Sequence, residues 1–291
     1  GTPFVDHHSA FFSMIGVYLI LICIKKESKY LSFSIPAFFI LGFMSKQVPS
    51  IYLIISSIPL FLLYALYNKK LFLISSFSYC LISFISILFI FGAINNISLN
   101  NFIEQYFLYP QSIALDRFEN FEISILGVIG NFKFIFLSLL ILIVANVQSI
   151  KKDKILKDKN NYYTFIVLVS ALVLIFHQLL TKNQIFIFFL IPFILGMANL
   201  SIKNKMLRAA SIILCVIGTL KYHERFNENR KFHELQNVNL TIAINANIID
   251  KKLDGLKWIS PQFRDAPKTE VEVINEIKNI LRKDERKKMV L

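Results

Sequence analysis

Residues 71–94, LFLISSFSYCLISFISILFIFGAI, contain neither a charged side chain nor a proline. A run of this length matches the roughly 20 residues that an α-helix needs to cross the hydrocarbon core of a bilayer. Apolar residues fall on every side of such a helix, as they do in a helix surrounded by lipid. The segment therefore predicts a membrane-spanning helix.

The rest of the chain repeats this pattern. Of its 291 residues 55% are hydrophobic, including 29 Phe, and the mean hydropathy of +0.56 is well above that of an ordinary water-soluble domain. The apolar residues form blocks, and the charged residues crowd into the gaps between them. We therefore expect an all-α polytopic membrane bundle of about eight transmembrane helices. The apolar blocks lie at 9–24, 31–44, 51–67, 71–94, 132–147, 162–180, 185–200 and 206–220.

The positions of the basic residues exclude a nucleic-acid binder and predict an orientation. The net charge is +13, but thirteen of the eighteen basic residues before residue 222 lie in alternate connectors between apolar blocks, at 25–30, 68–70, 151–161 and 201–208. The opposite connectors hold only three basic residues, Lys46, Arg117 and Lys182. By the positive-inside rule, the lysine-rich connectors are cytoplasmic and the chain lies in the inner (plasma) membrane.

The composition changes after residue 221. Residues 222–291 carry charges distributed as in a domain that folds in water, and we expect this part on the extracytoplasmic side. Thr269 and Glu272 form a capping box that opens a helix with apolar residues at helical spacing. The last residues resemble the beginning of a strand. We therefore expect a transmembrane domain over 1–221 and the start of a small soluble α/β domain over 222–291, in a chain that is a fragment of a longer protein.

The outer ends of the predicted spans hold the candidate site residues. Asp6 and His8 form an Asp-x-His pair that can bind a divalent metal ion, and His7 lies between them. The alternative is a polar helix start. Lys46, followed by Gln47, lies at the non-cytoplasmic end of a span, where an ammonium can offset the charge of a phosphate. The alternative there is a lysine that only reaches to the interface.

Two further segments face the same side. The loop at 95–131 is rich in aromatic residues, which predicts an amphipathic helix in the interface, with Glu104, Tyr109 and Arg117 as polar candidates. A surface salt bridge is the alternative for Glu104 and Arg117. His177 and Lys182 flank the turn between the sixth and seventh blocks, which by itself is typical of a simple hairpin.

Three features resemble the GT-C class of membrane glycosyltransferases, in particular the protein mannosyltransferases and the lipid A aminoarabinose transferase. They are the outer Asp6, the Gly-Phe-Met-Ser-Lys-Gln-Val-Pro turn at 42–49, and the run from Thr181 to Phe193. The chain departs from the family pattern at Gln47, where the family has Gly, and at Ile185, near a Tyr position. The resemblance covers about residues 1–220.

The resemblance implies inverting transfer of a sugar from a polyprenyl-phosphate donor to a lipid, glycan or protein acceptor. Lys46 and Lys182 would hold the donor phosphate, and Asp6 and His8 would orient the acceptor or a metal ion. An acidic catalytic residue would precede residue 1. The competing hypotheses are a transporter or lipid flippase, against which the nearly charge-free spans argue, and a membrane scaffold whose soluble tail binds a partner. We expect the remaining substrate contacts from His7, Gln47, Glu104, Tyr109, Arg117 and His177.

Overall fold

A computed structural model describes residues 5–112, 125–147, 157–181, 186–224 and 238–283. The chain divides into two compact units, Gly1–Lys221 and Tyr222–Leu291. The division falls where the composition of the sequence changes. Each unit is described by itself.

The first unit is a bundle of α-helices. Within its described residues, each predicted apolar block corresponds to one helix, except the seventh. The seventh block contains the short 3-10 helix η3 (Phe186–Phe189) followed by α9. The long helices are α1 (Val5–Lys26), α2 (Lys29–Ser45), α3 (Gln47–Tyr67), α4 (Leu71–Ile94), α7 (Ile125–Val147), α8 (Lys159–Thr181), α9 (Leu190–Asn199) and α10 (Lys205–His223).

Not all of these helices are long enough to cross a bilayer. Among the described residues, 6 helices have the required length and apolar composition: α1, α3, α4, α7, α8 and α10. The other two apolar segments, Lys29–Ser45 and Ile187–Asn199, are shorter. A helical membrane bundle is therefore supported, whereas the count of about eight spans stays a prediction.

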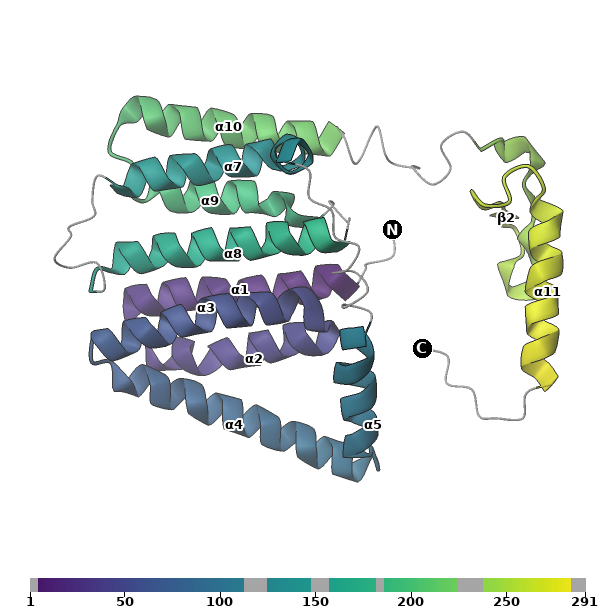
Figure 1. Cartoon of the computed structure of the whole chain (residues 1–291), viewed down its shortest axis with the longest axis horizontal. Helices are drawn as coiled ribbons and strands as arrows, with labels where there is room; N and C mark the ends of the chain where they lie inside the picture. The colour runs from purple at the N-terminus through teal and green to yellow at the C-terminus, as the bar shows by residue number, and fades with distance from the viewer. Residues whose placement is uncertain (1–4, 113–124, 148–156, 182–185, 225–237, 284–291) are drawn as a thin grey trace. The chain divides into compact units, whose positions relative to one another are not determined.

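Helix α1 lies in the middle of the packing. It contacts α2, α3 and α8, while α9 packs against α7 and α8. In Figure 1 the long helices lie side by side, and α4 diverges from α2 along its length. The side chains of Val17, Ile20 and Ile24 on α1 are fully buried, whereas α4 leaves most of its second half exposed. Because those exposed residues are apolar, they fit contact with lipid.

The bundle has two ends with different chemistry. The start of α1 lies beside the α2–α3 turn, since the Ser9 hydroxyl donates to the Lys46 carbonyl over 2.9 Å. We call this the Lys46 end. The end of α1 lies beside the starts of α4 and α8, because the Glu27 carboxylate pairs with Lys70 and Lys159 at 2.7 and 2.8 Å. We call this the Glu27 end.

A short helical segment crosses the Lys46 end. It consists of α5 (Leu99–Ile103) and a π-helical turn, η1 (Glu104–Leu108). Figure 1 shows α5 running across the direction of the long helices, from the end of α4 towards the α2–α3 turn. The predicted helix is therefore present, and its direction fits a helix that lies in a membrane interface.

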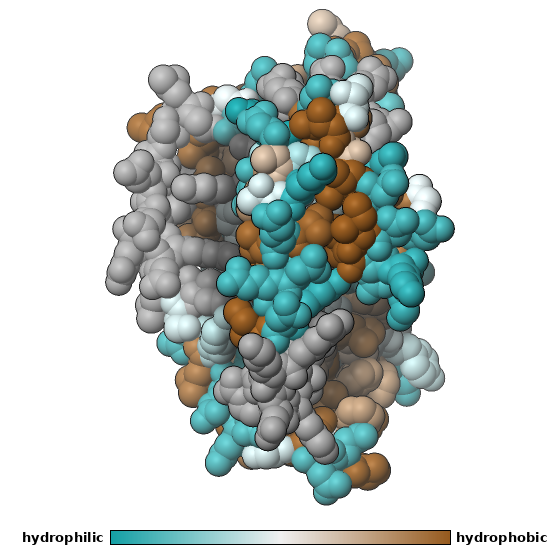
Figure 2. Space-filling model, turned by 90° about the vertical axis from the view of Figure 1, so that its right-hand side faces the viewer, coloured by the Kyte–Doolittle hydropathy of each residue, from teal (hydrophilic) through white to brown (hydrophobic). Residues whose placement is uncertain are grey.

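The second unit is small and mixed. Strands β1 (Ile244–Asn245) and β2 (Lys257–Trp258) pair antiparallel, with Ile244 opposite Trp258. Helix α11 (Pro267–Lys283) is joined to β2 by a hydrogen bond, in which the Trp258 indole N–H donates to the Glu270 carboxylate over 3.0 Å. Three 3-10 turns, η6 (Leu240–Ile242), η7 (Ala246–Ile248) and η8 (Lys251–Leu253), complete the described part. Figure 2 shows hydrophobic surface bordered by hydrophilic residues on the face that it displays.

The predicted start of the last helix is wrong by three residues. The helix was expected to begin after a Thr269 cap, but α11 begins at Pro267, which places Thr269 inside its first turn. Proline is favoured at the first helical position because its fixed φ suits the helix and its missing N–H would have no partner there. The predicted helix itself is confirmed.

Candidate functional site

A cluster of buried serines fixes Lys46 against α1. The Ser9 hydroxyl donates to the Lys46 carbonyl and lies 2.7 Å from the Ser50 hydroxyl, which in turn lies 2.6 Å from that of Ser13. All three serines are fully buried. In an apolar bundle such hydroxyls stabilise the packing only when they bond to one another or to the backbone. The cluster therefore sets the backbone of Lys46 close to that of His8.

Gly42 makes this arrangement possible. A Cβ atom on Gly42 would lie 2.4 Å from the Ser13 hydroxyl oxygen and 2.8 Å from that of Ser50. Only a residue without a side chain lets α2 approach the serine cluster so closely. Gly42 was predicted only as part of a motif, and the three serines were not predicted. The spacing of four between Ser9 and Ser13 on α1 was the available signal.

The crossing segment is bonded to the same turn. The Gln47 side-chain amide donates to the Tyr106 carbonyl over 2.9 Å, and the Tyr106 hydroxyl donates to the Phe43 carbonyl over 2.6 Å. The ring of Tyr106 stacks on that of Phe102, with centroids 5.2 Å apart. Burial raises the pKa of Tyr106 to about 12, so its hydroxyl stays protonated and remains a donor. Gln47 thus acts in this structure as an anchor for η1.

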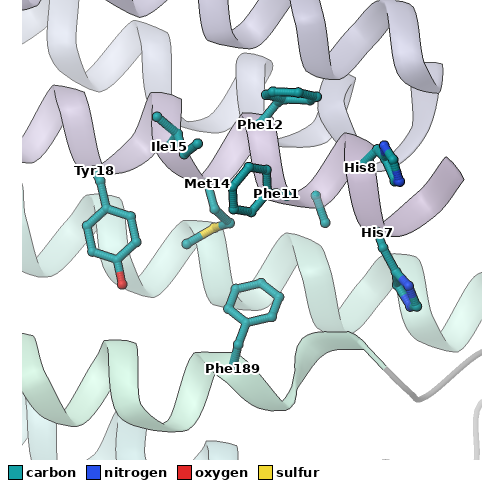
Figure 3. A pocket seen from close by; sticks show the side chains of 9 residues that line it. His7, His8, Phe11, Phe12, Met14, Ile15, Tyr18 and Phe189 are labelled. Carbon is teal, nitrogen blue, oxygen red and sulfur yellow. The ribbon is translucent and has the colours of Figure 1, made fainter. Parts of the chain in front are cut away.

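An apolar cavity of about 740 Å³ lies along the first half of α1. Figure 3 shows Met14 and Tyr18 of α1 extending towards the side on which Phe189 of η3 lies. His7 and His8 lie at one end of this lining and Tyr18 at the other (Figure 3). The cavity thus joins an apolar wall to a pair of imidazoles at the Lys46 end. Its lining consists of His7, His8, Ala10, Phe11, Phe12, Met14, Ile15, Tyr18 and Phe189.

His177 lies in the helix packing and not in this lining. Its side chain is only 1% exposed, and its ring centroid lies 6.1 Å from that of Tyr52 on α3. The next residue, Gln178, is equally buried, and neither amide atom of its side chain has a hydrogen-bond partner among the residues that the structure describes. Gln178 was not among the predicted site residues. The buried polar pair lies at the Lys46 end, on the side of α3.

Several predicted residues are exposed or lie outside the described part. Glu104 and Tyr109 are exposed on the crossing segment. Arg117 and Lys182 lie outside the described residues, as does the side chain of Asp6, whose backbone belongs to the first turn of α1. The Glu104–Arg117 pair and the phosphate-binding role of Lys182 therefore stay predictions. The structure brings His7, His8, Lys46 and Gln47 to one end.

The predicted metal site also stays a prediction. Within the described ranges, no group of three or more His, Cys, Asp or Glu side chains comes together. His8 is exposed at the start of α1, and the Asp6 carboxylate is not among the described side chains. The described residues by themselves do not define a metal site.

Comparison with protein-family models, with curated proteins and with solved structures found no match for this chain.

Proposed function

We propose that this chain is a membrane glycosyltransferase that moves a sugar from a polyprenyl-phosphate donor to an acceptor at the outer face of the inner membrane. The observation that carries the proposal is the apolar cavity along α1, which ends at His7 and His8. From His7 to Tyr18 the helix rises by roughly 16 Å. A cavity of this length and lining can hold the first isoprene units of a lipid carrier.

The polar groups at the Lys46 end of the bundle, where the cavity ends at His7 and His8, suit a phosphate. The imidazoles of His7 and His8 can donate hydrogen bonds to phosphate oxygens. Lys46 follows the serine cluster at the same end and supplies a positive charge. In the transfer, the acceptor hydroxyl oxygen attacks the anomeric carbon while the bond from that carbon to the phosphate oxygen breaks. The electron pair stays on the polyprenyl phosphate, whose charge an ammonium offsets.

The group that takes the proton of the acceptor hydroxyl is inferred from the family resemblance. The proton of the acceptor hydroxyl would pass to an acidic side chain expected before residue 1. Lys182 would help Lys46 to hold the phosphate, and Asp6 with His8 would orient the acceptor. The acceptor class, whether lipid, glycan or protein, follows from the resemblance alone.

The proposal places the Glu27 end in the cytoplasm. Lys25, Lys70 and Lys159 from the lysine-rich connectors lie there, and the positive-inside rule assigns that side to the cytoplasm. The bundle then has about eight spans, the Lys46 end faces outwards, and the second unit is extracytoplasmic.

The test is transfer by the purified protein in detergent, extended upstream to include the acidic residue that the resemblance implies, with a panel of undecaprenyl-phosphate-linked hexoses and pentoses. Release of undecaprenyl phosphate is the readout. Lys46→Ala is expected to lower kcat by about a hundredfold because it removes the charge opposite the leaving phosphate. Ile15→Trp fills the cavity and is expected to raise KM with a smaller effect on kcat. Lys29→Ala, an exposed lysine at the Glu27 end, is the matched control.

Each part of the proposal has a result that would contradict it. Equal turnover by wild type and Lys46→Ala would exclude a role of Lys46 in the reaction. An unchanged KM in Ile15→Trp would exclude the cavity as the binding site of the donor lipid. Flux of a polyprenyl phosphate across vesicles without sugar transfer would instead support the transporter or flippase hypothesis.

A further inference from the structure

A second cavity lies at the Glu27 end, away from the proposed catalytic site. Its volume is about 320 Å³, and residues of α1, α7 and α8 line it together with residues at the end of α9. The apolar part of the lining is Leu142, Met197 and Leu200. The polar part is Lys25, Asn146, Lys159, Asn160, Tyr163, Thr164 and Ser201.

One lysine of this cavity, Lys159, is held in place by an ion pair. The Lys159 ammonium lies 2.8 Å from the Glu27 carboxylate and donates to the Lys25 carbonyl over 3.3 Å. Glu27 also pairs with Lys70 at 2.7 Å and accepts a hydrogen bond from the Tyr64 hydroxyl over 2.9 Å. Lys159 is therefore fixed beside the last turn of α1.

The charges around the cavity leave an excess of positive charge. Lys25, Lys70 and Lys159 lie at this end, against the carboxylates of Glu27 and Asp158. Asp158 accepts a hydrogen bond from the Asn160 backbone N–H over 2.9 Å. The Lys25 side chain is exposed and forms no ion pair with any described residue. Lys25 is thus available to an anion.

We propose that this cavity binds the phosphate group of an anionic phospholipid. The ammonium groups of Lys25 and Lys159 offer charge-assisted hydrogen bonds, and the hydroxyls of Tyr163 and Ser201 offer further donors. The apolar residues Leu142, Met197 and Leu200 provide a surface for the start of the acyl chains. Basic cavities between helices are a recurring form of head-group recognition. A free phosphate would use the same lysines but would gain nothing from the apolar residues.

The proposal concerns a separate end of the bundle and does not depend on glycosyl transfer. The test uses the full chain in a non-ionic detergent and measures binding by native mass spectrometry. The probes are dioctanoyl phosphatidylglycerol, dioctanoyl phosphatidylcholine and inorganic phosphate. Phosphatidylglycerol is expected to bind more tightly than either of the other two.

The variants separate this cavity from general surface charge. Lys25→Gln is expected to weaken phosphatidylglycerol binding about fivefold, which corresponds to about 1 kcal/mol, and Lys25→Arg is expected to retain it. Lys26→Gln, an exposed lysine that does not line the cavity, is the matched control. Size-exclusion elution and helical circular dichroism check that each variant is folded.

Three results would overturn the proposal. Phosphatidylcholine could bind as tightly as phosphatidylglycerol, or Lys26→Gln could weaken binding as much as Lys25→Gln. Inorganic phosphate could bind as tightly as the lipid, which would assign the cavity to a free anion instead.

Discussion

At the scale of single residues, the serine cluster decides how the candidate site is built. Ser9, Ser13 and Ser50 join α1 to the α2–α3 turn through hydroxyl contacts of 2.6 and 2.7 Å. Gly42 supplies the space for them. Lys46 is positioned by its backbone, through the Ser9 hydroxyl, so the reach of its side chain depends on this packing.

Gly42→Ala is therefore expected to lower the stability of the bundle by about 1–3 kcal/mol, because the new Cβ would overlap the Ser13 and Ser50 hydroxyls. Thermal unfolding in detergent measures the effect. Gly196→Ala in α9 is the control, since a Cβ there meets nothing within 4 Å. Equal melting temperatures for the two variants would contradict the role given to Gly42.

At the scale of elements, Glu27 ties three helices to the end of α1. It bonds Lys70 before α4, Lys159 at the start of α8 and Tyr64 in α3. Hydrogen bonds from Lys159 and Lys70 lower the pKa of Glu27 from about 4.5 to about 2. A lowered carboxyl pKa stabilises the fold above the unfolded value, and that stability is lost as the pH falls through the folded value.

Glu27→Gln is accordingly expected to cost about 1 kcal/mol at pH 7, a modest value because the ion pairs are partly exposed. The difference from wild type should shrink as the pH falls from about 4.5 to about 2. Unfolding measured across this pH range provides the check. A difference that stays constant with pH would show that the charge of Glu27 contributes nothing.

At the scale of the whole molecule, the topology depends on which helices cross the bilayer. Six are long enough, and α2 and the helix at Ile187–Asn199 are shorter. If all eight helices cross, successive connectors alternate between the two sides. If α2 does not cross, its two ends lie on the same side.

Labelling of single cysteines with a membrane-impermeant maleimide distinguishes these topologies. After removal of Cys23, Cys80 and Cys215, Asn96→Cys and Asp265→Cys are expected to react in intact cells. Lys29→Cys and Lys203→Cys are expected to react only after permeabilisation. Reaction of Lys29→Cys and Lys46→Cys under the same condition would contradict a spanning α2.

The sequence by itself determined where the helices of the bundle lie, and the block at 71–94 coincides with α4. This was possible because a helix in lipid satisfies its backbone hydrogen bonds locally, so a charge-free run is enough to predict it. The start of α11 was missed because cap residues compete within a few positions. Only the tertiary structure decided which side chains meet. The serine cluster, the Gln47–Tyr106 bond, the two cavities and the Glu27 ion pairs join residues from different helices, and no local pattern encodes such contacts.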